Sequence, residues 1–247
     1  MESSATDASQ RFEVRDWGAG IDWWRTAMRG MFASGQFLPW VLIGFVATVV
    51  LLVASFVPLV GTLAQGWLGV VLGGGLAVAA RRTSDASTPS LEDLFAGFRS
   101  RLRELSIAGL VLGVAGVVLG LLVAVVGFGG FLGVIVHGDT PGYAGGLGAL
   151  PAWLLLMLVL LLGFVPIGMA AWLAPALIML REMEPVEALK ASLRAAWANS
   201  GALTLYGLVF IGLALVASAL LGLGWLVLLP LLYLSTYAAY VDIFGDD

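Results

Sequence analysis

The stretch FLPWVLIGFVATVVLLVASFVPLVGTLAQGWLGVVLGGGLAVAARR, from Phe37 to Arg82, decides the fold. It carries no charged side chain before Arg81. A helix that crosses a bilayer needs about 20 consecutive apolar residues. The stretch is therefore long enough for two such helices, with a turn at the sequence PLVG that begins at Pro58. We predict transmembrane spans over residues 38–60 and 63–80.

The rest of the chain has the same character, because 60% of its residues are hydrophobic and its mean hydropathy is +1.01. Four further apolar runs predict spans over residues 106–126, 152–180, 202–221 and 225–241. Pro166 and Pro175 lie inside the fourth, and we expect them to kink it. The predicted fold class is an all-α integral membrane protein with six transmembrane helices.

Basic residues predict the orientation. All twelve Lys and Arg residues lie before the first span, between spans two and three, or between spans four and five. On the opposite side of a six-span arrangement the one charged residue is Asp139, in a Gly-rich loop that follows His137. Basic residues favour the cytoplasmic side. We therefore expect both termini in the cytoplasm, with residues 1–16 as a disordered tail and residues 17–247 as a single membrane domain.

The three charged segments resemble one another when Ile21, Leu91 and Val186 are superposed. Apolar residues then recur at offsets of 3, 7 and 11, which form one face of an α-helix. Acids coincide at Asp22, Glu92 and Glu187, and arginines coincide at Arg29, Arg99 and Arg194. We interpret the chain as three repeats, over about 17–82, 83–181 and 182–247, each an amphipathic cytoplasmic helix followed by a transmembrane hairpin. The alternative is that any interfacial helix shows this pattern, since the helix dipole favours acids near its start and arginines near its end.

Local signals support the starts of two of these helices. Ser90 and Asp93 have the spacing of a capping box, and Pro185 suits the first position of a helix. If the three arginines are equivalent, they form a collar that binds anionic lipid head groups or acids of neighbouring helices. The alternative is three independently solvated arginines.

Small residues form rows on two spans. Span three has Gly109, Gly113, Gly116 and Gly120 on one narrow face, and span two has Gly66, Gly69, Gly73, Ala77 and Ala80. Such rows let helices approach closely in lipid. They predict either packing of spans two and three against each other or a docking face for another membrane protein or a second copy.

Residues suited to catalysis are scarce. The chain has no cysteine and one histidine, so we expect no catalytic residue, metal site, cofactor or nucleic-acid partner. The spans lack ionisable side chains, which weighs against an ion pump or a carrier of charged substrates. An apolar or weakly polar molecule could still pass along Thr48, Ser55, Ser218, Ser235 and Thr236. Most tryptophans, including Trp23, Trp24, Trp40 and Trp172, fit anchoring at the membrane interface.

The whole chain resembles uncharacterised bacterial six-span inner-membrane proteins of the YciC type, which are related to the membrane domain of some glycerophosphodiester phosphodiesterases. The resemblance lies in FLPWVLIGFV from Phe37, FVPLVG from Phe56, WLAPALIML from Trp172 with PVEALKASLRAAWANSG from Pro185, and YLSTYAAYVDIF from Tyr233. It implies a multi-pass protein of the bacterial inner membrane. No catalytic residue transfers, because the phosphodiesterases owe catalysis to a separate soluble domain.

Two hypotheses of function follow. The first is a non-enzymatic protein that scaffolds, assembles or regulates a partner membrane complex. The second is a transporter or channel for a lipid-like or small apolar molecule. A partner or second copy that co-purifies would favour the first hypothesis. A cavity open to one side would favour the second, and a helix core packed solid from face to face would exclude it.

Overall fold

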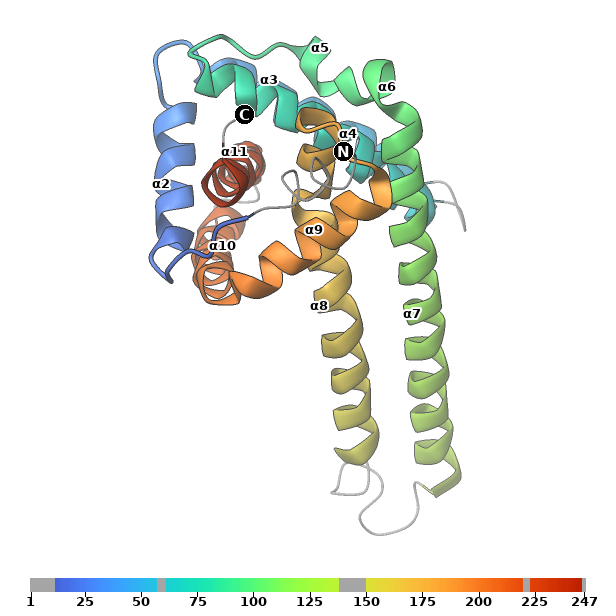
Figure 1. Ribbon diagram of the computed structural model, residues 1–247. Helices are drawn as coiled ribbons and strands as arrows, with labels where there is room; N and C mark the ends of the chain where they lie inside the picture. The colour runs from blue at the N-terminus through green and yellow to red at the C-terminus, as the bar shows by residue number, and fades with distance from the viewer. Residues whose placement is uncertain (1–11, 57–60, 138–149, 220–222, 246–247) are drawn as a thin grey trace, which may run out of the picture.

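A computed structural model describes residues 12–56, 61–137, 150–219 and 223–245, and every regular element in these ranges is a helix (Figure 1). Six helices are long and apolar enough to cross a membrane. They are α3 (Phe37–Ser55), α4 (Gly61–Ser84), α7 (Leu102–His137), α8 (Leu150–Leu180), α10 (Ser200–Ala219) and α11 (Trp225–Phe244). The predicted all-α, six-span fold is confirmed.

The α7 and α4 helices extend beyond the predicted ends of their spans. The α7 helix runs to His137, although its glycines predicted an end near Val126. The α4 helix continues past Arg81 and Arg82 to Ser84, because charged side chains at a helix end can reach water while the backbone remains helical. Most of the Gly-rich loop, including Asp139, and the turn at Pro58 lie outside the described residues.

Short helices precede each pair of long ones. They are α2 (Ala19–Met31), α5 (Leu91–Leu94) with α6 (Ala96–Ser100), and α9 (Pro185–Ala198). The Ser90 amide donates to the Asp93 carboxylate at 2.8 Å, and Pro185 occupies the first turn of α9, so both predicted starts are confirmed. The middle segment is two helices and not one, with the break at Phe95. The element order agrees with the predicted units, and their origin as repeats stays a prediction.

The short helices belong to the protein core. The α2 helix packs on α10 and α11, and a Cβ on Gly20 would overlap the carbonyl oxygen of Ala202. Trp23 and Trp24 of α2 are 2% and 1% exposed, and Trp40 of α3 is fully buried. The interpretation of these three tryptophans as interfacial anchors is therefore wrong, because their rings fill the space between helices.

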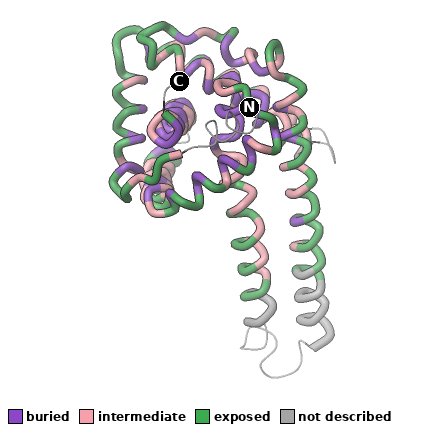
Figure 2. The backbone as a smooth tube through the Cα atoms, in the orientation of Figure 1, coloured by how far each residue is buried: buried purple, intermediate pink, exposed green. Residues whose placement is uncertain are grey.

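The α7 and α8 helices lie side by side and extend away from the other helices (Figure 1). Along this extension their described residues are mostly exposed or intermediate (Figure 2). Leu119 of α7 packs against the backbone at Gly163 of α8 and is 7% exposed. Leu121 and Leu154 are over 60% exposed, as expected for side chains that face lipid.

The N-terminal segment from Phe12 to Asp16 crosses the end of the protein where the short helices and their charged residues lie. We call this the charged end. The Glu13 amide donates to the Ile243 carbonyl at 2.7 Å, and the Phe12 ring packs edge-on against Phe244. The expectation that residues 1–16 form a disordered tail is therefore wrong for residues 12–16, because α11 supplies them with hydrogen bonds and apolar contacts. Residues 1–11 lie outside the described residues.

Candidate functional site: three cavities along α4

A polar cavity of about 660 Å³ lies at the charged end of the helices, among the N-terminal segment, α2, α4 and α11. Its charged lining residues are Arg15, Asp16, Asp22 and Asp242. Its other lining includes Trp23, Thr26, Ala80, Thr83 and Tyr237. We call it the polar cavity.

A smaller cavity of about 260 Å³ lies deeper, among α4, α8, α10 and α11, and we call it the central cavity. Four aromatic residues are among its lining, namely Trp172, Tyr206, Tyr233 and Tyr237. Tyr237 lines both this cavity and the polar cavity. The two spaces are therefore neighbours, with the Tyr237 side chain between them.

A third cavity of about 750 Å³ opens where the α7–α8 pair leaves α4, and we call it the apolar cavity. Its lining carries no charge, and Gln65 is its one polar side chain. The other lining residues are Leu, Val, Ile, Phe, Ala, Pro and Gly of α4, α7 and α8. Gly69, Ala171 and Pro175 line both the apolar and the central cavity. The three cavities therefore form one series.

The α4 helix runs along the whole series. Five of its residues between Leu63 and Val70 line the apolar cavity, and four between Gly69 and Ala77 line the central cavity. Ala80, Thr83 and Ser84 line the polar cavity. From Gly66 to Thr83 a helix rises about 26 Å at 1.5 Å per residue, close to the roughly 30 Å thickness of a bilayer core. All five small residues of the predicted row on this span line a cavity: Gly66, Gly69, Gly73, Ala77 and Ala80.

The glycine row of α7 has two environments. Gly109 packs on Trp67 of α4, where a Cβ would lie 3.2 Å from the Trp67 Cα, so this part is a helix contact. Gly113, Gly116 and Gly120 line the apolar cavity, and a Cβ on either of the last two would meet nothing within 4 Å. Part of the row therefore packs internally, as one predicted alternative stated, and the rest faces open space.

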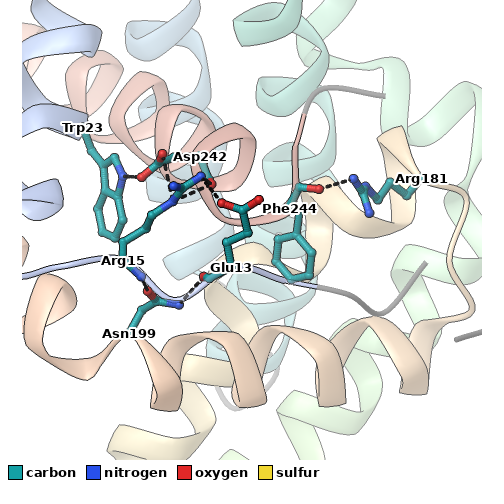
Figure 3. A network of polar contacts seen from close by, with 7 residues as sticks. All are labelled: Glu13, Arg15, Trp23, Arg181, Asn199, Asp242 and Phe244. Carbon is teal, nitrogen blue, oxygen red and sulfur yellow. Dashed lines mark hydrogen bonds and ion pairs between the residues drawn. The ribbon is translucent and has the colours of Figure 1, made fainter. Parts of the chain in front are cut away.

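A polar network joins the N-terminal segment to the ends of α9 and α11 beside the polar cavity (Figure 3). Arg15 Nε lies 3.1 Å from Asp242 Oδ1 and donates to the Asp242 carbonyl, and Arg15 Nη2 lies 2.7 Å from Glu13 Oε2. The Arg15 amide donates to Asn199 Oδ1 at 2.7 Å. Trp23 Nε1 donates to the second carboxylate oxygen of Asp242 at 2.9 Å. Asp242 thus fixes both the Arg15 guanidinium and the Trp23 ring.

Aromatic rings continue from the polar cavity to the central one. The Trp23 ring centroid lies 5.8 Å from that of Trp172 and 5.9 Å from that of Tyr206, and Trp172 and Tyr206 are 5.9 Å apart. The Tyr206 hydroxyl lies 2.9 Å from Ser235 Oγ, deep between α10 and α11. These contacts hold three aromatic side chains together where the two cavities meet.

The six repeated charged residues lie apart from this series, except for Asp22. Arg29, Arg99 and Arg194 are all exposed on the short helices. Glu92 pairs with Arg99 at 3.6 Å across the break between α5 and α6. Asp22 instead pairs with Arg25 at 2.8 Å, and Glu187 with Lys190 at 3.0 Å. The contact between Glu92 and Arg99 thus joins an acid and an arginine with the seven-residue spacing.

The predicted polar path is present only in part. Thr236 lines the central cavity and Ser235 is buried behind it. Thr48 donates to the Gly44 carbonyl of its own helix, and Ser218 accepts from Trp225 Nε1. The Ser55 side chain lies outside the described part.

Sequence reasoning missed Asn199 and the roles of Trp23, Trp172 and Asp242. Asn199 is a buried amide at the end of an amphipathic helix, and such a group must find partners. Asp242 is the one acid inside the apolar pattern that closes the chain, which was a usable signal. The tryptophans carried no signal that separates core rings from interfacial ones.

In the described ranges, no group of three or more His, Cys, Asp and Glu residues comes together that could hold a metal ion. His137 lies at the edge of these ranges, and Asp139 lies outside them.

Six long apolar helices around such cavities define the class as an α-helical integral membrane protein. The chain is similar to the probable inner membrane protein BTH_II0599 of Burkholderia thailandensis, with 30% identity. The match covers 84% of this chain and 85% of the relative. The chain belongs to the same family of inner-membrane proteins. No family model matches it, and no solved structure does.

Proposed function

We propose that this inner-membrane protein binds a lipid-like amphiphile and gives it a path between the bilayer and the charged end of the protein. The observation that carries the proposal is the cavity series, in which one helix, α4, leads from an apolar space of about 750 Å³ to a polar space of about 660 Å³. An amphiphile matches this order, because its chain prefers the apolar end and its head the polar end.

The small residues of α4 support the proposal. A row that served only helix packing would be filled by neighbouring side chains. Gly66 and Gly69 instead have nothing within 4 Å of a built Cβ, and Gly73 meets only Pro175, at 3.4 Å. The row therefore keeps space open along the path.

The scaffolding hypothesis was motivated by the scarcity of catalytic residues and by the small-residue rows, with the glycine row of α7 as a possible docking face. Gly113, Gly116 and Gly120 line the apolar cavity, so an amphiphile chain accounts for them without a partner protein. The proposed protein is non-enzymatic. We further propose that both termini are cytoplasmic, on the distribution of basic residues, and that the family extends to the YciC type, on the stretches given above.

Filling the junction between the apolar and central cavities tests the function. Gly69→Leu places a side chain at a position that lines both. Gly212→Leu is the matched control, because Gly212 is exposed on α10 and also has nothing within 4 Å of its Cβ. Both variants should keep the thermal stability of the wild type.

Equilibrium dialysis would measure binding of radiolabelled twelve-carbon amphiphiles to the protein in phosphatidylcholine nanodiscs, with empty nanodiscs as the blank. We expect saturable binding of at least one probe to the wild type and to Gly212→Leu, and at least tenfold weaker binding to Gly69→Leu. Binding no greater than in empty nanodiscs, for every probe, would overturn the proposed function.

A further inference from the structure

We infer that the amphiphile carries an ammonium head group, so that the path selects lipophilic cations over neutral and anionic molecules with the same chain. The inference rests on the proposed function and names its substrate class. It draws on the central cavity, its junction with the polar cavity, and the charges at the open end.

The central cavity has the smallest volume of the three, and aromatic side chains form part of its lining. Trp172, Tyr206, Tyr233 and Tyr237 contribute from three different helices, and no residue of its lining is charged. Aromatic faces attract cations through the ring quadrupole, and they recognise quaternary ammonium groups in particular. A carboxylate or phosphate would lose its hydration here and gain no cationic partner.

The charge of the polar cavity is opposite to that of an ammonium group. Its described lining holds three carboxylates, Asp16, Asp22 and Asp242, against one guanidinium, that of Arg15. Arg15 is bound to the carboxylates of Asp242 and Glu13, and Asp22 is paired with Arg25 outside the lining. With these partners included, four carboxylates stand against two guanidinium groups. The cavity therefore has excess negative charge, which raises the local concentration of cations at the mouth.

The two spaces are physically coupled through Trp23. Its ring lines the polar cavity and contacts Trp172 and Tyr206, which line the central cavity. Its indole N–H donates to Asp242 and so fixes the ring. The carboxylates of the polar cavity are thus linked to the aromatic side chains of the central cavity by direct contacts through Trp23.

This assignment revises one expectation from the sequence. The lack of ionisable side chains in the spans weighed against a carrier of charged substrates. A ring of aromatic side chains removes that objection for cations alone, because it stabilises a positive charge without a buried carboxylate.

Three probes with one chain length test the inference in the nanodisc assay described above: dodecyltrimethylammonium, dodecanol and dodecanoate. We expect the ammonium probe to bind at least tenfold more tightly than the other two. Trp172→Leu should remove this preference and leave dodecanol binding within about twofold, because leucine keeps an apolar surface but has no aromatic face. Trp172→Phe should restore most of the preference.

A second variant avoids the core. Asp16 is exposed, and Asp16→Asn removes one charge at the mouth with little change in volume. We expect it to weaken the ammonium probe several-fold at low salt and much less at high salt. Equal affinities for the three heads would overturn the inference and leave the proposed function standing. Absence of binding for all three probes would overturn both the inference and the proposed function. An ammonium preference that is unchanged in Trp172→Leu and Asp16→Asn would overturn the assignment to these residues.

Discussion

Ser192 of α9 accepts a hydrogen bond from the backbone amide of Leu173 in α8, at 3.0 Å. The same hydroxyl donates to the carbonyl of Met169 at 2.7 Å. In a regular helix this amide and this carbonyl are each other's partners, four residues apart. The serine hydroxyl thus bonds to both groups of this helical pair, at a point of α8 between Pro166 and Pro175.

Ser192→Ala should therefore destabilise the protein by about 1–3 kcal/mol, the cost of leaving buried polar groups without a partner. Ser192 is fully buried, so water does not replace the hydroxyl without a rearrangement of α8 and α9. Denaturation followed by circular dichroism in mild detergent would measure the change. Ser100→Ala is the control, since Ser100 is exposed and bonds to Ala96 of its own helix. Equal stabilities of the two variants would show that Ser192 is not a structural bridge.

Arg15→Ala should release the N-terminal segment from α11. The variant loses the ion pairs with Glu13 and Asp242, and at partial exposure such pairs contribute about 1 kcal/mol. We expect about fivefold faster hydrogen exchange at the Glu13 amide, which mass spectrometry of an N-terminal peptide would detect. Arg25→Ala, which removes an exposed pair with Asp22 on the next helix, should leave this exchange unchanged. Protection that survives in Arg15→Ala would mean that Asn199 and Phe12 hold the segment by themselves.

Local features of the sequence predicted the fold well. An apolar run of span length defines a helix wherever it occurs, and the capping residues Ser90, Asp93 and Pro185 act on their own turns. The cavities could not be predicted in this way. The row from Gly66 to Ala80 was visible, but whether small residues enclose a contact or a space depends on how α7 and α8 are placed beside α4.

Contacts between distant segments were also beyond the sequence. Arg15 and Asp242 are 227 positions apart, and no local spacing in the sequence indicates that they pair. At the first apolar offset of the three similar segments, the equivalent residues Trp24, Leu94 and Leu189 are all buried. Their neighbours at the next offset differ, because Met28 is 40% exposed and Phe98 is half-buried.

The cytoplasmic placement of the charged end is open to a labelling test, which the absence of native cysteine makes simple. Ser87→Cys, on the exposed segment after α4, should react with an impermeant maleimide only after the cells are permeabilised. A cysteine in place of His137 should react in intact cells. Ser87 is preferable to Thr83, because Thr83 accepts a hydrogen bond from Trp40 and lines the polar cavity. The reverse labelling pattern would invert the proposed orientation.

The last prediction concerns the exposed arginines of the short helices. Arg29, Arg99 and Arg194 lie on α2, α6 and α9, the helices that surround the charged end, and a basic residue near an anionic leaflet gains about 1 kcal/mol. Replacing all three with Gln should lower the thermal midpoint by several degrees more in anionic than in zwitterionic nanodiscs. The matched control replaces Arg25, Arg103 and Lys190, which removes the same charge from the same three parts of the chain. If the arginines form a collar that binds head groups, the control should have the smaller effect, because Arg25, Arg103 and Lys190 do not share the position that recurs in the three segments. Equal losses in the two triple variants would mean that only total charge matters at this surface, and that the shared spacing has no role in lipid binding.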